Sequence, residues 1–222
     1  MQVRAAIFDM DGLLVDTEPL WRRVETRVFA ELGVHLTDAL CESTKGLRIE
    51  EVVAHWHSVC PWQSPSVPAV VERIVDEMLE RIRTEATPKP GVRHAIDLAR
   101  AIPMRLALAS SSHTRLIRAV LERLELVDAF EVVCSGEHEP HGKPHPGIFL
   151  TAASRLGVEA RACVVFEDSI AGVIAGKAAR MRVVAIPESP SPAFAVADVV
   201  RASLLEVRAG DLTGDPDAPG AV

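Results

Sequence analysis

Short, nearly continuous apolar runs recur along the chain, separated by longer segments of mixed polarity. Because buried strands give such runs, we expect strands at residues 3–8, 104–109, 130–134, 162–166, 182–186 and, more weakly, 197–200. Apolar residues recur every three to four positions in the intervening segments 91–101, 112–124, 145–157 and 169–181, which predicts helices. Continuous hydrophobicity favours a sheet covered on both faces. The alternation predicts an α/β fold with a doubly wound parallel sheet and right-handed crossovers.

The stretch from residue 18 to residue 87 breaks this rhythm, because it has a helical pattern throughout. Pro and Ser interrupt it at residues 60–68, and "TPKPG" marks the return to alternation. We therefore predict a helical cap at 18–87, inserted in a Rossmann-like core made of residues 1–17 and 88–209. Residues 210–222 are rich in Gly, Pro and Asp, and this composition predicts a flexible C-terminal tail.

Polar residues gather just after three of the predicted strands. Asp9 and Asp11 follow the first, Ser110 the second, and Glu167 and Asp168 the fourth. Each residue alone has a local explanation, since Asp and Ser commonly cap turns and helices. Together they favour a ligand site, because the carboxyl edge of an open parallel sheet is where ligands bind.

The spacing of the first two aspartates indicates a cation site. In an extended segment, residues two apart project to the same side, so Asp9 and Asp11 can face one bound group while Gly12 turns the backbone away. Such close like charges repel unless a cation lies between them. With Asp168 nearby, the oxygen donors suit Mg²⁺ better than the larger cage of Ca²⁺. No cluster of His or Cys offers the softer ligands of zinc.

Composition narrows the classes of protein that remain. With 222 residues, 48% of them hydrophobic, the chain can form one substantial domain, or a core plus a small accessory domain. A net charge of −7 without a long basic run argues against nucleic-acid or anionic-membrane partners. The four scattered cysteines are typical of free thiols in a cytosolic protein. No signal-peptide pattern and no window near the roughly 18 apolar residues of a membrane span occur, so we expect a cytoplasmic protein.

Four segments together resemble a known family. "FDMDGLLVDTE", "LALASSS", "GKPHP" and "VVFEDSIAGVIAGKAARM" are similar, in order and separation, to the four signatures of the haloacid dehalogenase superfamily of phosphotransferases. The resemblance spans the chain apart from its tail. The helical insertion resembles the cap of the subclass that includes beta-phosphoglucomutase. The segment "STKGLRIEEVVAHWHSVCPW", with "GKPHP" and "KAARMR", looks most like hexitol and 2-deoxyglucose-6-phosphate phosphatases.

The resemblance implies roles for the carboxylates. Asp9 would be the nucleophile that forms an aspartyl-phosphate, and Asp11 the general acid that protonates the leaving oxygen and then the base that activates water. The carboxylates of Asp9 and Asp168 and the backbone carbonyl of Asp11 would hold Mg²⁺. Glu167 would assist, either as a direct ligand or from behind the ligands.

The resemblance also implies roles for two residues of the core. Ser110 would donate a hydrogen bond to a phosphoryl oxygen, and Lys143 would pair with Asp9 and with the transferring group. The alternative for Lys143 is a solvated loop lysine. Its position in "GKPHP", between a flexible glycine and a stiff proline, favours an aimed side chain instead.

Further residues are expected to meet the substrate. By the same resemblance, Lys45, Gly46 and Arg48 fall in the cap loop that faces it, and Arg48 could recognise a second polar or phosphate group. Ser111 and Ser112 follow the motif serine and are assigned to the substrate by adjacency alone. The three tryptophans of the insertion could form an aromatic wall for a sugar, but core packing of a small helical bundle is the favoured interpretation.

The sequence therefore predicts a Mg²⁺-dependent phosphatase of small sugar phosphates, namely hexose, deoxyhexose or hexitol phosphates. Two alternatives stay open. A mutase of the beta-phosphoglucomutase type shares every catalytic residue named above, and a non-catalytic sugar-phosphate-binding protein could keep the fold without turnover. We expect a monomer with no nucleic-acid or membrane partner.

Overall fold

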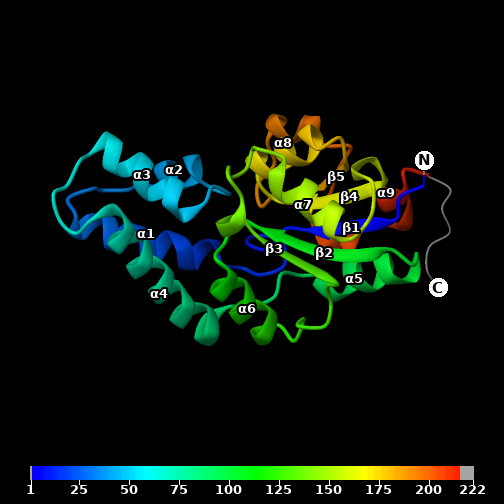
Figure 1. Ribbon diagram of the computed structural model, residues 1–222, viewed down its shortest axis with the longest axis horizontal. Helices are drawn as coiled ribbons and strands as arrows, with labels where there is room; N and C mark the ends of the chain where they lie inside the picture. The colour runs from blue at the N-terminus through cyan, green and yellow to red at the C-terminus, as the bar shows by residue number, and fades with distance from the viewer. Residues whose placement is uncertain (1, 216–222) are drawn as a thin grey trace.

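A six-stranded parallel sheet forms the centre of the protein (Figure 1). The computed structural model describes residues 2–215. The strand order is β3-β2-β1-β4-β5-β6, so the chain reverses its direction of winding beside β1. The strands are β1 (Ala5–Phe8), β2 (Arg105–Ser110), β3 (Val132–Ser135), β4 (Cys163–Glu167), β5 (Arg182–Ala185) and β6 (Val199–Val200). All six strands that the apolar runs predict are present, and the predicted α/β fold is confirmed.

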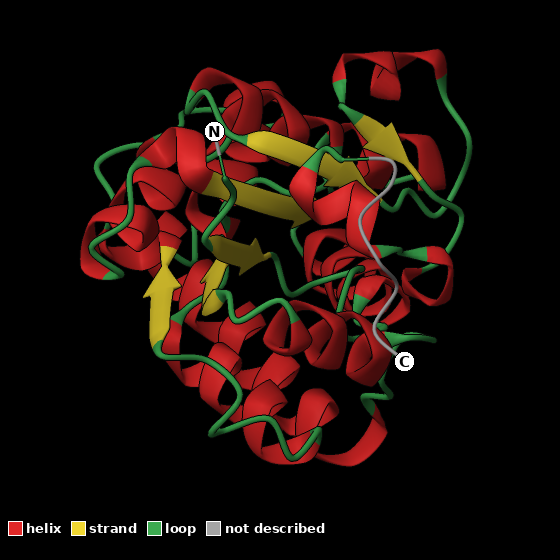
Figure 2. Cartoon of the chain, turned by 90° about the vertical axis from the view of Figure 1, so that its right-hand side faces the viewer, coloured by secondary structure: helices red, strands yellow, loops and turns green. Residues whose placement is uncertain are grey.

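The two faces of the sheet bury different side chains because successive residues of a strand point to opposite sides. In β1, Phe8 faces the side that carries α5 (Val92–Ala101) and α6 (Thr114–Arg123). Ile7 faces the side that carries α7 (Gly147–Arg155) and α8 (Ile170–Ala178). Figure 2 shows helices on both sides of the strands. The sheet is therefore buried on both faces, as its continuous hydrophobicity predicts.

Four helices between β1 and β2 lie in the segment 18–87 that the sequence predicts to be an inserted cap. They are α1 (Glu18–Glu31), α2 (Asp38–Ser43), α3 (Ile49–Val59) and α4 (Val67–Glu85), and they extend to one side of the sheet in Figure 1. Val70, Ile74, Met78 and Ile82 recur every four residues along α4 and are fully buried. These side chains belong to one apolar cluster with those on the α5 and α6 side of the sheet. The cap thus shares its core with the sheet domain.

The first part of the predicted C-terminal tail is structured. Residues Ala209–Thr213 form a short helix, α9, in which Leu212 is fully buried. Asp211 forms an ion pair with Arg201 at 2.6 Å and accepts a hydrogen bond from the Arg208 backbone N–H. The prediction of a tail from residue 210 is therefore wrong for this helix, because one anchored apolar side chain and one ion pair outweigh a composition rich in Gly and Asp. The rest of the predicted tail, residues 216–222, lies outside the described residues.

Short 3₁₀ turns complete the secondary structure. They are η1 (Gly136–His138), η2 (Ala160–Ala162), η3 (Pro192–Val196) and η4 (Leu204–Glu206). All four cysteines are free, in agreement with the scattered spacing. Within residues 2–215, no helix combines the length and the apolar character that crossing a bilayer requires.

Candidate active site

The loop after β1 carries Asp9 and Asp11 to the carboxyl edge of the sheet. Asp9 continues the pairing of β1, because its backbone N–H donates to the carbonyl of Phe166 at 3.0 Å. Gly12 has a φ of +78°, and a Cβ at this position would collide with the carboxylate of Asp168. Only glycine meets both requirements, since an L side chain disfavours this backbone conformation. The loop is therefore held tightly against the residues that follow β4.

Lys143 lies at the centre of the site with its side chain 2% exposed. Its Nζ is 2.5 Å from Oδ1 of Asp9 and 2.6 Å from Oε1 of Glu167, and it lies over the ring of Phe149. Burial disfavours the ammonium, but the two carboxylates outweigh this effect and raise the pKa of Lys143 above its ordinary value. Lys143 therefore stays charged between the residues that end β1 and β4.

Glu167 is fixed through both of its carboxylate oxygens. Oε1 accepts from Lys143, while Oε2 accepts from the backbone N–H and the hydroxyl of Ser169 at 2.8 and 3.0 Å. The same Ser169 hydroxyl accepts from the Gly172 N–H and caps α8. Since neither oxygen is free of a partner, Glu167 mainly holds Lys143 in place.

Asp168 forms an ion pair with a lysine of the cap. Nζ of Lys45, in the loop between α2 and α3, is 2.8 Å from Oδ2 of Asp168. Gly46 allows this approach, because its φ is +81° and a Cβ there would lie 2.7 Å from Oγ of Ser169. Burial and the neighbouring Glu167 carboxylate raise the pKa of Asp168 to about 7, although Lys45 acts against this shift. The two cap residues that the sequence predicts for the substrate thus lie beside the carboxylates.

Three buried carboxyls can supply ligands to one metal ion. Asp9, Glu167 and Asp168 each offer an oxygen, and these atoms lie within 4.8 Å of one another. Burial raises the pKa of Asp9 well above its ordinary value; Lys143 opposes the shift, and the neighbouring carboxylates add to it. Lys143 and Lys45 therefore leave negative charge in this cluster incompletely compensated. An all-oxygen donor set with such an excess of charge fits a hard divalent cation.

Asp11 has a separate set of partners. Its Oδ1 accepts hydrogen bonds from the Thr17 hydroxyl at 2.6 Å and from the indole Nε1–H of Trp21 at 3.2 Å. Its Oδ2 accepts from the hydroxyls of Ser112 at 2.7 Å and Ser110 at 3.3 Å. Trp21 belongs to the first helix of the cap and Thr17 directly precedes it, whereas Ser110 and Ser112 lie at and just after the end of β2. The Asp11 side chain is therefore oriented independently of the Lys143 network.

The serine loop after β2 connects the two domains. Ser110 is fully buried, and its hydroxyl accepts from the Ser112 backbone N–H at 3.0 Å. The Ser111 hydroxyl donates to the carbonyl of Gly46 at 2.9 Å, so it holds the cap loop. Ser111 and Ser112 line the cavity between cap and core, whereas Ser110 is not among the lining residues. The structure thus brings two of the three predicted serines to the cavity wall.

Arg48 does not line the cavity. Its Nη2 donates to Oε1 of Glu51 at 2.7 Å, and its Nη1 donates to the carbonyls of Glu139 at 2.8 Å and Gly136 at 3.3 Å. Glu51 in turn accepts from the Gly142 N–H, next to Lys143. The guanidinium therefore joins the start of α3 to the core loops, and in this arrangement it is not placed to meet a second phosphate.

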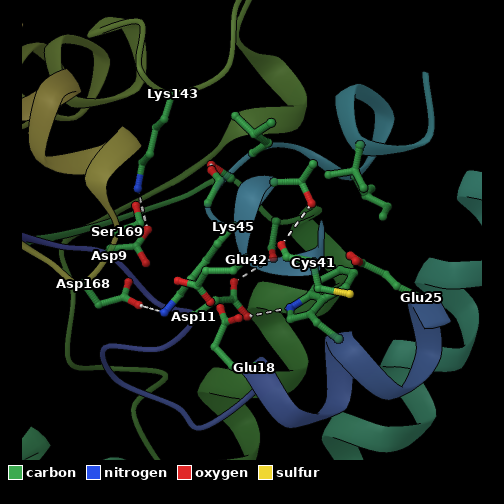
Figure 3. A pocket seen from close by; sticks show the side chains of 18 of the residues that line it. Asp9, Asp11, Glu18, Glu25, Cys41, Glu42, Lys45, Lys143, Asp168 and Ser169 are labelled. Atoms are coloured by element: carbon green, nitrogen blue, oxygen red, sulfur yellow. Dashed lines mark hydrogen bonds and ion pairs between the residues drawn. The ribbon is translucent and has the colours of Figure 1, made fainter. Parts of the chain in front are cut away.

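The first cap helix supplies cavity residues, and of these the sequence interpretation considered only Trp21, as part of an aromatic wall. Glu18, Trp21, Arg22 and Glu25 of α1 all line the cavity, and Figure 3 shows Glu18 and Glu25 among its side chains. These residues follow one another at intervals of three, one and three, which places them on one side of a helix that starts just after the aspartate pair. This spacing could have predicted that they line the site. Trp21 packs against the apolar cluster, as the favoured interpretation predicts, and its indole N–H also donates to Asp11.

The other two tryptophans pack as expected. Trp56 is 4% exposed within the apolar cluster. Trp62 packs against that cluster, contacts the ring of Phe29 and donates its indole N–H to the carbonyl of Pro65. The aromatic wall of three tryptophans is therefore absent, and only Trp21 reaches the described cavity.

Comparisons with known sequences point to phosphatases. The chain matches the family model described as haloacid dehalogenase-like hydrolase over residues 6–186. It is 43% identical over 217 residues to hexitol phosphatase B of Escherichia coli K12, covering 96% of this chain and 98% of that protein. It is 34% identical over 177 residues to a phosphorylated carbohydrates phosphatase of Thermotoga maritima, covering 80% and 82%.

Solved structures share the architecture. CbbY from Rhodobacter sphaeroides, in complex with phosphate, aligns with a TM-score of 0.83 at 25% identity, over 92% of this chain and 96% of that one. Beta-phosphoglucomutase from Clostridium difficile aligns with a TM-score of 0.84 at 22% identity, over 93% of each chain. At that identity the second likeness supports the fold alone.

Proposed function

The chain belongs to the haloacid dehalogenase-like hydrolases and hydrolyses phosphoric monoesters, and from this premise we propose a Mg²⁺-dependent sugar-phosphate phosphatase that acts through an aspartyl-phosphate. The observation that carries the proposal is the buried Lys143, which bridges Asp9 and Glu167 beside an independently held Asp11. This arrangement separates a nucleophile from an acid and base within one cavity.

Asp9 is the nucleophile in this proposal. A carboxylate oxygen of Asp9 attacks phosphorus, a new oxygen–phosphorus bond forms, and the bond from phosphorus to the leaving sugar oxygen breaks. Lys143 holds Asp9 through one oxygen and stabilises negative charge on the transferring group. Glu167 keeps the ammonium aimed, because it binds Lys143 with one oxygen and Ser169 with the other.

Asp11 moves the protons. In the first half-reaction its protonated carboxyl gives a proton to the leaving sugar oxygen, and in the second the carboxylate takes a proton from the water that attacks the acyl phosphate. Thr17, Trp21 and Ser112 orient the carboxyl for both steps. Because Trp21 belongs to the cap, proton transfer depends on how the cap is placed.

The carboxylates of Asp9 and Asp168, with Glu167 behind them, would hold Mg²⁺. When bound, the ion supplies positive charge that stabilises the transferring phosphoryl group. The excess of buried carboxylates over lysines supports this assignment. The Asp11 backbone carbonyl, implied by the resemblance, remains a proposed further ligand.

Sugar phosphates are the proposed substrates because this chain is similar to hexitol phosphatase B and to the carbohydrate phosphatase over most of their lengths. A mutase must hold a second phosphate at the cap end of its cavity. Arg48 is bound to Glu51 and to core carbonyls instead, and this observation favours hydrolysis over isomerisation. No observation favours a non-catalytic binding protein.

The proposal is tested by assaying hexitol, hexose and deoxyhexose phosphates with and without Mg²⁺, together with beta-glucose 1-phosphate primed with the bisphosphate. We expect Mg²⁺-dependent release of inorganic phosphate, abolished by Asp9→Asn. Formation of glucose 6-phosphate without net phosphate release would establish a mutase instead. Hydrolysis that persists unchanged after removal of divalent cations would contradict the metal assignment.

A further inference from the structure

Glu25 is a buried carboxyl without a partner. It is 8% exposed, and it forms no hydrogen bond or ion pair with another described residue. It lines the cavity between cap and core, and Figure 3 shows its side chain extending from α1 toward the other lining residues. The carboxyl therefore faces the space that a substrate would fill.

A carboxyl in this position is costly to the folded protein. Burial alone raises the pKa of Glu25 to about 7, because no described cation compensates its charge. An apolar residue of similar size would not carry this cost. A hydrogen-bonding ligand would offset the cost by supplying the missing partner.

The position of Glu25 along α1 relates it to one end of the substrate. Trp21 contacts Asp11, the proposed proton donor to the leaving oxygen. Glu25 lies four residues further on, which is about 6 Å along a helix. A substrate with its phosphoryl group at Asp9 and its leaving oxygen at Asp11 would therefore extend past Trp21 toward Glu25.

The surrounding charges suit hydroxyl groups better than a second anion. Glu18 and Glu42 also line the cavity, and burial raises the pKa of Glu18 to about 7. Among the described cavity residues of the cap, Glu18, Glu25 and Glu42 outnumber the cations, since Lys45 pairs with Asp168 and only Arg22, 3.8 Å from Asp38 in an exposed pair, stands beside them. Carboxyls accept hydrogen bonds from hydroxyls and, when protonated, also donate one. They repel a phosphate or carboxylate.

We propose that Glu25 binds the hydroxyl groups at the end of the substrate distal to the phosphate. It thereby selects long, singly phosphorylated polyol or sugar substrates over short ones and over bisphosphates. This inference rests on the proposed sugar-phosphate phosphatase function and assigns a residue to its substrate specificity.

The test compares polyol monophosphates of increasing length, from glycerol 3-phosphate to sorbitol 6-phosphate, with an aryl phosphate and a hexose bisphosphate. Glu25→Gln keeps shape and hydrogen bonding, whereas Glu25→Leu removes the hydrogen bonds. Glu80→Gln is the matched control, because Glu80 is an exposed glutamate of the cap on α4. Thermal unfolding of each variant shows whether it is folded.

We expect Glu25→Leu to lower the kcat/KM ratio of sorbitol 6-phosphate to glycerol 3-phosphate about tenfold, the effect of losing one or two hydrogen bonds. Glu25→Gln should retain most of this ratio and raise the relative activity toward the bisphosphate. Glu80→Gln should leave both ratios unchanged. An equal loss on all substrates, or an unchanged length dependence in Glu25→Leu, would overturn the inference.

A binding measurement separates this inference from the proposed function. In the Asp9→Asn background, calorimetry should show tighter binding of sorbitol 6-phosphate than of glycerol 3-phosphate, and Glu25→Leu should remove the difference. Equal affinities in the presence of Glu25 would overturn the role of Glu25, even if hydrolysis proceeds as proposed. Failure of the wild-type protein to hydrolyse any of these phosphates, with the affinity difference intact, would overturn the phosphatase instead.

Discussion

Asp11 illustrates how single residues of the cap take part in the chemistry of the core. Of its four donors, Trp21 comes from the first helix of the cap and Thr17 directly precedes that helix, while Ser110 and Ser112 lie at and just after the end of β2. A carboxyl that donates and then accepts a proton must be aimed at the leaving oxygen. The indole of Trp21 is therefore a positioning group for Asp11.

Trp21→Phe removes the indole donor while keeping an aromatic ring. We expect kcat for a sugar phosphate to fall roughly threefold to tenfold, because one hydrogen bond that orients the acid is lost. An aryl phosphate should be affected less, since its leaving group needs little protonation. Steady-state kinetics with both substrates give the ratio.

Trp62→Phe is the control for this substitution. The indole N–H of Trp62 donates to the carbonyl of Pro65, and this residue does not line the cavity. This variant should leave the ratio between the two substrates unchanged. Equal losses on both substrates in Trp21→Phe would show that Trp21 supports the fold of the cap and does not orient the acid.

Helices and loops determine which predicted residues reach the cavity. The apolar runs predict the strands to within a few residues, for example 162–166 against the observed Cys163–Glu167, because buried parallel strands carry an unmistakable local pattern. The polar residues at their ends could be placed for the same reason. The partners of Arg48 could not, because Gly136 and Glu139 meet α3 only after the cap folds onto the core.

The sequence could not predict which face of α1 lines the cavity, for a related reason. Glu25 is adjacent to the buried Val24, and a glutamate within an amphipathic helix is ordinarily assigned to the solvent side. Only the docking of the helix over the sheet edge makes this position internal. Helix α9 could not be predicted from its composition either, because it forms where Leu212 becomes buried against the rest of the fold.

Arg48→Met tests the connection between α3 and the core loops. The substitution removes the hydrogen bonds to the carbonyls of Gly136 and Glu139, so the cap should close less firmly over the substrate. We expect KM to rise several-fold for all substrates alike, with a smaller change in kcat. Initial-rate kinetics on mono- and bisphosphates measure the effect.

Arg115→Met is the matched control, because Arg115 also joins the core to the cap, through exposed ion pairs with Glu72 and Asp76. Such pairs contribute little, so this variant should behave like the wild type. A loss in Arg48→Met restricted to bisphosphates would restore the predicted recognition of a second phosphate by Arg48.

The buried carboxyl of Glu25 is expected to lower the stability of the whole protein. The apolar cluster is continuous from the cap to one face of the sheet, so we expect cap and core to unfold together. Glu25 has a pKa of about 7 in the folded state and 4.5 as its ordinary value. The unfolded chain therefore binds fewer protons than the folded protein between these pH values.

Stability should consequently fall as pH rises from about 4.5 to 7 and then level off, by about 3 kcal/mol from this one group. Glu25→Gln lacks the titrating proton, so the difference between wild type and variant should grow between pH 5 and pH 8. Urea unfolding at both pH values gives this difference, in which carboxyls that do not interact with Glu25 cancel. The Glu25 charge also raises the pKa of Glu18, so the substitution removes this smaller contribution as well. A difference that does not change with pH would show that Glu25 is not buried as a carboxyl.

The covalent role of Asp9 is tested most directly by trapping the phosphoenzyme. The protein is mixed with Mg²⁺ and a hexitol phosphate, quenched rapidly in acid, digested and examined by mass spectrometry. We predict a phosphoryl group on the peptide that contains Asp9, more abundant in Asp11→Asn when an aryl phosphate is the donor, because hydrolysis of the intermediate then lacks its base. It should be absent in Asp9→Asn. Turnover by Asp9→Asn at the wild-type rate, or a phosphoryl group on another residue, would contradict the mechanism.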